Sequence, residues 1–470
     1  MTFCESAGAW AADFALGDAP ERVRERARLQ TSAILAAGHA GAAAAAPMAA
    51  VAPEGPLGEV YAGAAASIAH DWDDYLFMGH TGHSSVWVSR ALAGEPDTAL
   101  RAQIAGNEVA GRLGAALLLG PHNGQFWSAI HCASAAAAAG VALGLDAGPL
   151  SHALAIALYQ PPYGLWPGFM GPPTKLLTAA DPAVQGARAA LLAAEGVRGA
   201  LDVVESPRGL LRHFAFAPRP RMLGHLGEVW LTDTLAFKPA PGCAYLQSAV
   251  AAVLESGVEA DEVAGIEIDA GYLTLAMEEL GAAAGLTPVG VTFSTARSVA
   301  VALLAGRLTH EELDPSWLAR HEAAIHDLAA RVELHHDWQL TLATVRGTVQ
   351  AGATLRDVPI RALPHVVRRF RALDGPALPR RAGALLVDRR LRRQARELLH
   401  HAAGAGLGAL DTEALRMTFP ARLRIRLRSG RQLEIEGAER GACGHPVAEQ
   451  RAVVDAKARA VGLIGAMSAS

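Results

Sequence analysis

The stretch HDWDDYLFMGHTGHS, residues 70–84, concentrates side chains that can transfer protons. Its carboxylates and imidazoles belong to Asp71, Asp73, Asp74, His70, His80 and His83. Large apolar residues lie among them, which predicts partial burial, and burial beside other charges shifts pKa values toward the range that acid–base catalysis needs. The alternative is a helix end at which Asp71 caps backbone donors and the histidines make ordinary polar contacts.

Composition indicates a large globular protein of two or three domains. The chain has 470 residues, of which 51% are hydrophobic and 19% charged, and its net charge is -4. No long basic run occurs in the first two-thirds, so no nucleic-acid partner is expected. The arginines between Arg380 and Arg396 are interpreted as a solvated helix face.

The four cysteines indicate reduced thiols and a cytoplasmic protein. Cys4, Cys132, Cys243 and Cys443 form no CxxC pair, so neither a disulfide scaffold nor a zinc or iron–sulfur site is predicted. The N-terminus lacks the basic start of a signal peptide. The longest apolar run, Cys132–Leu145, is short for a membrane span and predicts a buried helix, so no membrane partner is expected.

Apolar periodicity predicts a chain that is nearly all α up to residue 236. Helices are expected over Pro20–His39, Leu57–Ala69, Arg90–Leu119, Ser128–Leu145 and Pro182–Glu195, with a break at Gly41–Pro56 and a structured loop at Pro161–Pro173. Beyond Phe237 the pattern becomes α+β. Strands are expected at Val263–Tyr272 and Leu334–Thr344, a hairpin at Leu423–Ile435, and helices at Val299–Ala305 and Asp455–Ile464.

The predicted fold therefore has two domains, a large all-α helical domain and a smaller α+β domain. The helical domain covers residues 1–236, and the C-terminal segment 440–470 is expected to return to it. The α+β domain covers residues 237–439. Within it, residues 345–417 match no motif and are interpreted as an insertion or a strongly diverged region.

Several motifs, taken in order, resemble the MmgE/PrpD family of 2-methylcitrate dehydratases, cis-aconitate decarboxylases and iminodisuccinate epimerases. They lie at Asp71–Asp74, Gly106–Leu113, Ala135–Asp146, Thr174–Leu176, Ala189–Gly196, Lys238–Pro239 with Cys243, Phe293–Ser294, Leu304–Gly306 and Gly430–Arg431. The chain departs from the family pattern at four places. These are Tyr75 after the acidic motif, Gln125–Ala129 before the Ala-rich helix, the region of Tyr245 and Gln247, and Thr295–Arg297.

The resemblance implies a cofactor-independent lyase or isomerase that acts next to a carboxylate, by dehydration, decarboxylation or epimerisation. Lys175 and Lys238 would bind substrate carboxylates and stabilise enolate-like charge. His83 or His80 would transfer the proton, and the spacing leaves that choice open. Asp71 would orient the histidine or take a proton itself. Tyr75 could bind a carboxylate or donate a proton, or could be a core aromatic residue.

The residues expected to bind substrate are His131, Trp127, Trp166 and Cys243. Trp127, Tyr163, Trp166 and Phe169 could line an apolar pocket, which predicts a substrate with a larger or less charged group. No metal site and no cofactor are expected. The expected partners are a small carboxylate-bearing substrate and a second copy of the chain in a homodimer. The alternative is a protein of the same fold that has lost catalysis and binds a small ligand or a protein partner.

Overall fold

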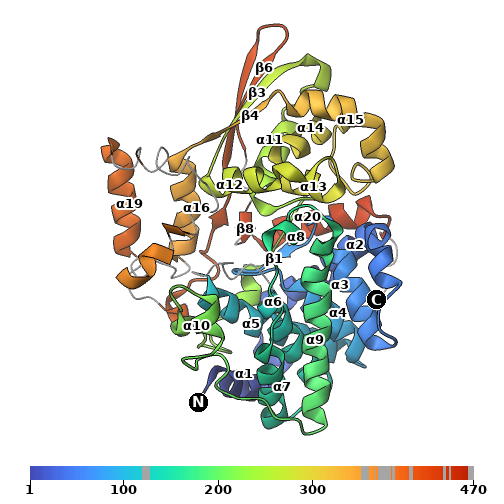
Figure 1. The fold of residues 1–470 in the computed structure, drawn as a ribbon, viewed down its shortest axis with the longest axis vertical. Coiled ribbons are helices and arrows are strands. Elements are labelled where there is room, and N and C mark those ends of the chain that lie inside the picture. Colours follow the sequence, from blue (N-terminus) through green and yellow to red (C-terminus); the bar gives the residue numbers. More distant parts are fainter. Residues whose placement is uncertain are drawn as a thin grey trace.

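The computed structural model shows a mostly helical protein with a small sheet region (Figure 1). It describes residues 1–118, 128–350, 359–365, 367–368, 383, 387–401, 406–437, 441–443 and 446–463. The helices of the first half form the lower body in Figure 1, and the sheet lies at the opposite end of the molecule.

The helical part is packed around one central helix. Its helices are α1 (Phe3–Asp13), α2 (Glu21–Ala49), α3 (Pro56–Ile68), α4 (Gly82–Leu92), α5 (Pro96–Leu117), α6 (Ser128–Ala142), α7 (Ala147–Tyr159), α8 (Trp166–Phe169) and α9 (Leu177–Ala194). Helix α6 contacts α1, α4, α5, α7 and α9. Small residues permit this packing, because a Cβ atom on Gly186 of α9 would lie 2.3 Å from the carbonyl oxygen of Cys132 in α6. The predicted buried helix at Cys132–Leu145 is confirmed.

Several helix boundaries differ from the prediction; α9 begins at Leu177 and not at Pro182, and the helix expected at Asp455–Ile464 covers Val447–Ala460. Helix α2 continues through the predicted break at Gly41 as far as Ala49, because Pro47 lies in its last turn, where a missing N–H donor interrupts little of the helix. The predicted helix Arg90–Leu119 is two helices, separated before Pro96, which starts α5. The predicted loop at Pro161–Pro173 contains the short helix α8.

The sheet region consists of four strands in the order β4-β3-β6-β7. Strand β3 (Val263–Ala270) pairs in parallel with β4 (Val332–His336) and antiparallel with β6 (Ala421–Leu427), which forms a hairpin with β7 (Gln432–Glu436). Between β3 and β4 lie α12 (Tyr272–Gly281), α13 (Pro288–Phe293), α14 (Thr295–Ala305) and α15 (Pro315–Ala329), and α11 (Gln247–Glu255) precedes β3. The predicted hairpin is confirmed, and the strand predicted at Val263–Tyr272 is confirmed as far as Ala270, since Tyr272 begins α12.

The predicted strand Leu334–Thr344 is only partly correct. The strand ends at His336, and helix α16 (Trp338–Gln350) comes next. The Asp337 carboxylate accepts from the backbone N–H of Gln339 at 2.6 Å, which favours the start of a helix there. Apolar alternation in a short segment does not distinguish the two structures, so the capping residue was the better signal.

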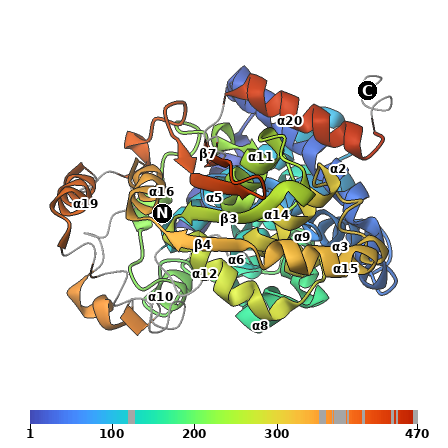
Figure 2. The same cartoon turned by 90° about the horizontal axis from the view of Figure 1, so that it is seen from above.

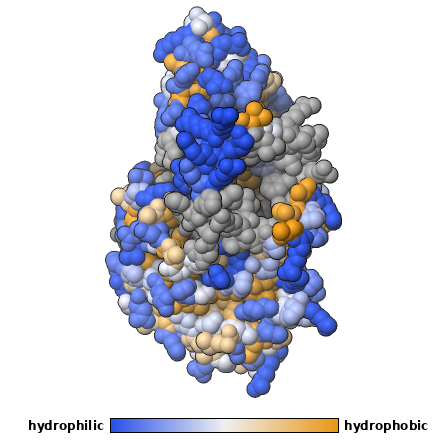
Figure 3. All heavy atoms as spheres, turned by 90° about the vertical axis from the view of Figure 1, so that its left-hand side faces the viewer, coloured by the Kyte–Doolittle hydropathy of each residue, from blue (hydrophilic) through white to orange (hydrophobic). Residues whose placement is uncertain are grey.

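One sheet face is charged and the other is apolar. Ile266, Ile268, Leu423 and Ile425 are buried on one side, while Arg424 on the other side contacts Glu267 at 2.9 Å and Asp269 at 2.7 Å. Figure 3 shows mostly hydrophilic side chains at this end of the molecule and small groups of apolar ones lower down. Helix α19 (Arg389–His401) also exposes arginines, among them Arg389, Arg390, Arg393 and Arg396.

Within the described ranges, one helix is long and apolar enough by composition to cross a membrane, namely α2. About 44% of its most apolar window is buried inside the protein. It contacts α3, α4, α5 and the last described helix, α20 (Val447–Ala460), beside which it runs in Figure 2. Core helices of soluble proteins share this length and composition.

A buried ion pair on α5 fixes the loop that leads to the second half of the chain. The carboxylate of Glu108 accepts from Arg112 at 2.6 Å, from the backbone N–H groups of Leu231 and Thr232, and from the Thr232 hydroxyl. The guanidinium of Arg112 donates to the carbonyl oxygens of Gly224, His225 and Val229. Both side chains are fully buried, so each charge depends on these partners.

We predict that Arg112→Met lowers the free energy of unfolding by about 3–5 kcal/mol, because it leaves the Glu108 charge buried without its cation. The double variant Glu108→Gln/Arg112→Met should recover part of this loss. Urea denaturation followed by circular dichroism measures both effects. A single variant as stable as the unchanged protein would show that the ion pair does not hold this loop.

Candidate active site

The acidic segment, which contains Asp71, Asp73 and Asp74, meets the segment that leads to Lys238 in a two-stranded ladder near the middle of the molecule (Figure 1). Strand β1 (Asp74–Tyr75) pairs antiparallel with β2 (Ala236–Phe237), and the backbone N–H of Lys238 donates to the carbonyl oxygen of Asp73 at 3.2 Å. This pairing brings Asp73 and Lys238, which are 165 positions apart in the sequence, into one cluster at the same end of the ladder.

Asp73 is the hub of this cluster. One of its carboxylate oxygens accepts from the Lys238 ammonium, and the other lies 2.9 Å from His80 Nδ1 and 3.0 Å from His83 Nε2. Burial alone would raise the pKa of Asp73, but the charges of Lys238 and His80 and the hydrogen bonds outweigh it and hold the pKa well below its usual range. Burial likewise opposes the charge of Lys238, yet the attraction of Asp73 and Asp71 raises its pKa.

Asp71 forms a second ion pair beside the first. Its Oδ2 atom accepts from the Lys175 Nζ atom at 2.7 Å, and that ammonium also donates to the carbonyl oxygen of Ile68. The Lys175 side chain is fully buried and lies over the Phe293 ring, 5.1 Å from its centroid. Asp71 has a φ of 51°, a left-handed conformation that aspartate tolerates better than most residues. The helix-capping alternative for Asp71 is therefore wrong.

The two histidines differ in their access to solvent. His83 is completely buried, with Nδ1 2.8 Å from the Ser67 hydroxyl and Nε2 3.0 Å from Asp73. The His80 side chain is 18% exposed. The sequence suggested that Asp71 orients the catalytic histidine. The carboxylate that contacts both histidines is instead that of Asp73.

Residues 56–222 match the family model of the MmgE/PrpD N-terminal domain. The chain carries an MmgE/PrpD N-terminal domain. The match supports membership of the MmgE/PrpD family, which includes dehydratases and related enzymes, and it confirms the resemblance carried by the motifs from Asp71 to Gly196. No curated protein matches the chain. Asp71, Asp73, both histidines and Lys175 lie inside the matched region, and Lys238 lies beyond it.

A buried polar network packs against the acidic segment and joins it to Gln30 of α2 and Asn107 of α5. The Asp74 carboxylate accepts from Gln30 at 2.5 Å and from the backbone N–H of Gly82 at 3.1 Å. The Thr81 hydroxyl donates to Asn107 at 2.6 Å, and Asn107 in turn donates to Gln30. Burial, together with the adjacent Asp73 charge, raises the pKa of Asp74. Asp74 is thus part of a buried framework and contributes to the position of β1.

The remaining predicted residues fall into two groups. Tyr75 and Cys243 lie at the cluster: the Tyr75 ring packs edge-on against His80 at 4.8 Å, and Cys243 Sγ donates to Asp71 Oδ2 at 3.6 Å. Burial and the Asp71 charge raise the pKa of the Cys243 thiol, which keeps it protonated. His131 lies one layer further in, 5.9 Å from the His83 ring, and burial lowers its pKa well below the usual value.

Of the two tryptophans predicted to bind substrate, the structure describes Trp166 alone. Trp166 is half-buried on α8, and Trp127 lies outside the described residues. Phe169, at the end of α8, packs edge-on against Phe293 with ring centroids 5.3 Å apart, so it reaches the aromatic ring beneath Lys175.

Sequence reasoning missed three groups of this cluster. Asp73 was given no role of its own, although it stands in the same motif as Asp71. Phe293 lies outside the matched domain, and its contact with Lys175 depends on tertiary packing. Lys457, on α20, donates to the carbonyl oxygen of Trp72 at 2.7 Å. The sequence did contain a signal for Lys457. Lysine is rare in this chain and occurs at only three positions, 175, 238 and 457.

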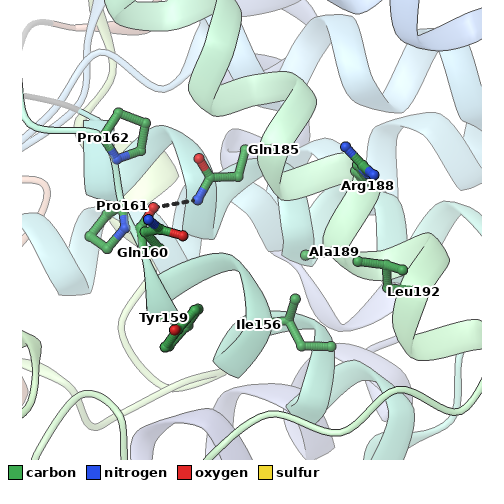
Figure 4. Close-up of a pocket in the computed structure, with 9 residues that line it drawn as sticks. All are labelled: Ile156, Tyr159, Gln160, Pro161, Pro162, Gln185, Arg188, Ala189 and Leu192. Carbon is green, nitrogen blue, oxygen red and sulfur yellow. Dashed lines mark hydrogen bonds between the residues drawn. The ribbon is translucent and has the colours of Figure 1, made fainter.

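A surface pocket of about 560 Å³ lies elsewhere on the MmgE/PrpD domain, at the end of α7 and along the outer part of α9 (Figure 4). Gln185 bridges its wall by donating to the carbonyl oxygen of Gln160 at 2.9 Å. The pocket residues on α9 begin at Gln185, ten positions beyond Lys175 in the sequence. None of the residues predicted for the site lines it.

Because the pKa of Asp73 is depressed in the folded state, its contribution to stability is present above about pH 4, the unfolded value, and is lost as the pH falls through the folded value. We predict that Asp73→Asn destabilises the protein at pH 7 and that its difference from the unchanged protein shrinks in acid. Urea denaturation at pH 7 and at pH 3 measures this. An equal difference at both pH values, or the same effect from Asp455→Asn on the exposed face of α20, would contradict the assignment.

Proposed function

We propose that this chain is a cofactor-independent enzyme that generates carbanion-like charge next to a carboxylate of a small substrate. The observation that carries the proposal is the adjacency of two buried ammonium groups, Lys175 and Lys238, each held by a carboxylate of the same short segment. Lysine is rarely buried without a partner or a function. Two such cations side by side suit a substrate with two carboxylates.

The lysines would supply the electrostatic part of catalysis. A substrate carboxylate that reaches Lys175 or Lys238 would share its cation with Asp71 or Asp73, whose oxygens already lie within hydrogen-bond distance. Loss of a proton from the neighbouring carbon places negative charge on the carboxylate oxygens, and fixed cations in a buried setting stabilise that charge more than water does.

His80 is the better candidate for the proton carrier. Both ring nitrogens of His83 are engaged, by Ser67 and Asp73, and the side chain is completely buried, so its role would be to orient Asp73. The His80 side chain is partly exposed at the same carboxylate. Asp73 would stabilise the imidazolium form after His80 takes a proton, as a carboxylate does for a histidine base elsewhere.

Three reactions share this carbanion-like charge and differ in how it forms and how it is neutralised. In dehydration a proton is removed and a hydroxyl group leaves as water after protonation; in epimerisation the carbon is reprotonated on the opposite face. In decarboxylation carbon dioxide departs and the carbon is then protonated. The Cys243 thiol and the Tyr75 side chain lie beside the cluster as candidate proton donors, and the Phe169–Phe293 pair favours a substrate with one less charged end.

We also propose the larger organisation that this chemistry implies. The helical part, residues 1–236 with residues 440–470, would be one domain, and residues 237–439 would be a smaller α+β domain, with the site at their junction. The active form would be a cytoplasmic homodimer. The contacts of Lys175 with Phe293, and of Cys243 with Asp71, support a junction site because each joins the two segments.

The test is proton NMR in heavy water with purified protein and citrate, 2-methylcitrate, cis-aconitate or iminodisuccinate. Deuterium incorporation or a new vinyl signal is expected for at least one acid. His80→Ala should slow it by about 100-fold or more, since general acid–base groups contribute about 10²–10⁴-fold. Lys175→Met should slow it by a similar factor, since removing one electrostatic stabiliser costs about 10²–10³-fold. His83→Ala should slow it less than His80→Ala.

The opposite outcomes separate the alternatives. If His83→Ala abolishes exchange and His80→Ala does not, the proton carrier is His83. If no acid reacts but the acids raise the melting temperature of the unchanged protein and not of Lys175→Met, the chain binds carboxylates without catalysis, as a family-fold protein that has lost its activity would.

A further inference from the structure

The three lysines of this chain contact three consecutive residues, one lysine to each residue. Lys175 donates to the Asp71 carboxylate, Lys457 to the Trp72 carbonyl oxygen, and Lys238 to the Asp73 carboxylate. All three lysines are buried, and every other basic residue of the sequence apart from histidine is an arginine. Lysine is among the residue types least often buried, so a third buried lysine at this segment requires an explanation.

Lys457 does not belong to the acidic segment's own part of the chain. It lies on α20, near the C-terminus, and its ammonium group is 2.7 Å from the Trp72 carbonyl oxygen and 5.5 Å from the centroid of the Trp72 ring. Helix α20 packs along α2, and an exposed ion pair between Arg451 and Glu25 also joins the two helices (Figure 2).

A second side chain on α20, that of Gln450, contacts the backbone beside Lys238. Gln450 accepts from the backbone N–H of Phe237 at 2.5 Å, directly before Lys238. Gln450 and Lys457 are seven residues apart, two helical turns, so both project from one face of α20. Both are at most 4% exposed. One helix face therefore contacts the chain beside Asp71 and Asp73 and the chain beside Lys238.

Stability alone does not account for Lys457. Burial lowers its pKa to about 7, so the surroundings do not fully offset the cost of removing its ammonium group from water. An arginine is the ordinary choice for an ion pair in this sequence, yet here a lysine donates to a backbone carbonyl group.

We propose that Gln450 and Lys457 are positioning residues, through which the C-terminal helix α20 fixes the relative placement of the acidic segment and Lys238. The inference rests on the proposed function for its catalytic consequence, while the positioning itself is independent of it. Each side chain acts through a backbone group, the Trp72 carbonyl oxygen for Lys457 and the Phe237 N–H for Gln450.

Hydrogen exchange followed by mass spectrometry tests the positioning without any substrate. In Lys457→Met, backbone amides of residues 70–76 should exchange about tenfold faster or more, while α6 is unchanged. In Gln450→Met, the faster exchange should centre on residues 236–243. The matched control is Arg459→Met, which removes an exposed cation from the same helix and should change neither segment.

Two exchange results would overturn the inference. One is exchange in both segments that equals that of the unchanged protein. The other is a uniform increase that includes α6 and is accompanied by a lower melting temperature, because that pattern marks a general loss of stability.

A kinetic measurement then tests the catalytic consequence. If the unchanged protein turns over one of the carboxylic acids, Lys457→Met should lower kcat by about tenfold or more while KM changes by less than about threefold, since the residue acts through the Trp72 backbone and not on the substrate. An unchanged kcat alongside faster exchange would show that the contact does not position the reacting groups. If the unchanged protein has no turnover, the proposed function fails, and the exchange experiment still decides the positioning.

Discussion

The structure depends on one buried carboxylate, that of Asp73. Lys238, His80 and His83 all converge on its two oxygens, and its side chain is almost completely shielded from solvent. A buried charge persists only where its partners are held in place, so the surrounding architecture must fix three side chains from two distant parts of the chain. The short β1–β2 ladder, the polar network below Asp74 and the Glu108–Arg112 ion pair meet this requirement.

This constraint also explains why the cluster draws on both halves of the chain. The first half of the chain supplies Asp71, Asp73 and Lys175 from helix ends and the segment between α3 and α4. The second half supplies Lys238 by strand pairing and Phe293 by packing. Because Lys175 and Lys238 are each paired with a carboxylate from a distant part of the sequence, the cluster holds its charges in two ion pairs.

Sequence patterns predicted the helices, the β3 strand and the hairpin because each produces a local periodicity. They also singled out the acidic motif and two of the lysines, because these residues carry the family resemblance. The family match over residues 56–222 includes the acidic motif and Lys175 and does not include Lys238. The sequence patterns failed where the information is not local. The pairing of Asp73 with both histidines, the Phe293 ring under Lys175 and the reach of Lys457 from the C-terminal helix all arise from tertiary packing. Pro47 misled the boundary of α2 because its effect depends on its position within the last turn.

The most direct test of the account is NMR of protein labelled with ¹³C at the lysine ε-carbon, since the chain gives only three signals, assignable with one Lys→Met variant each. Propane-1,2,3-tricarboxylate, which resembles citrate but has no hydroxyl leaving group, is the probe. The account predicts that the Lys175 and Lys238 signals shift and saturate on titration, while the Lys457 signal moves least. Lysine signals that stay unchanged at millimolar probe, or a shift confined to Lys457, would contradict carboxylate binding by the paired lysines.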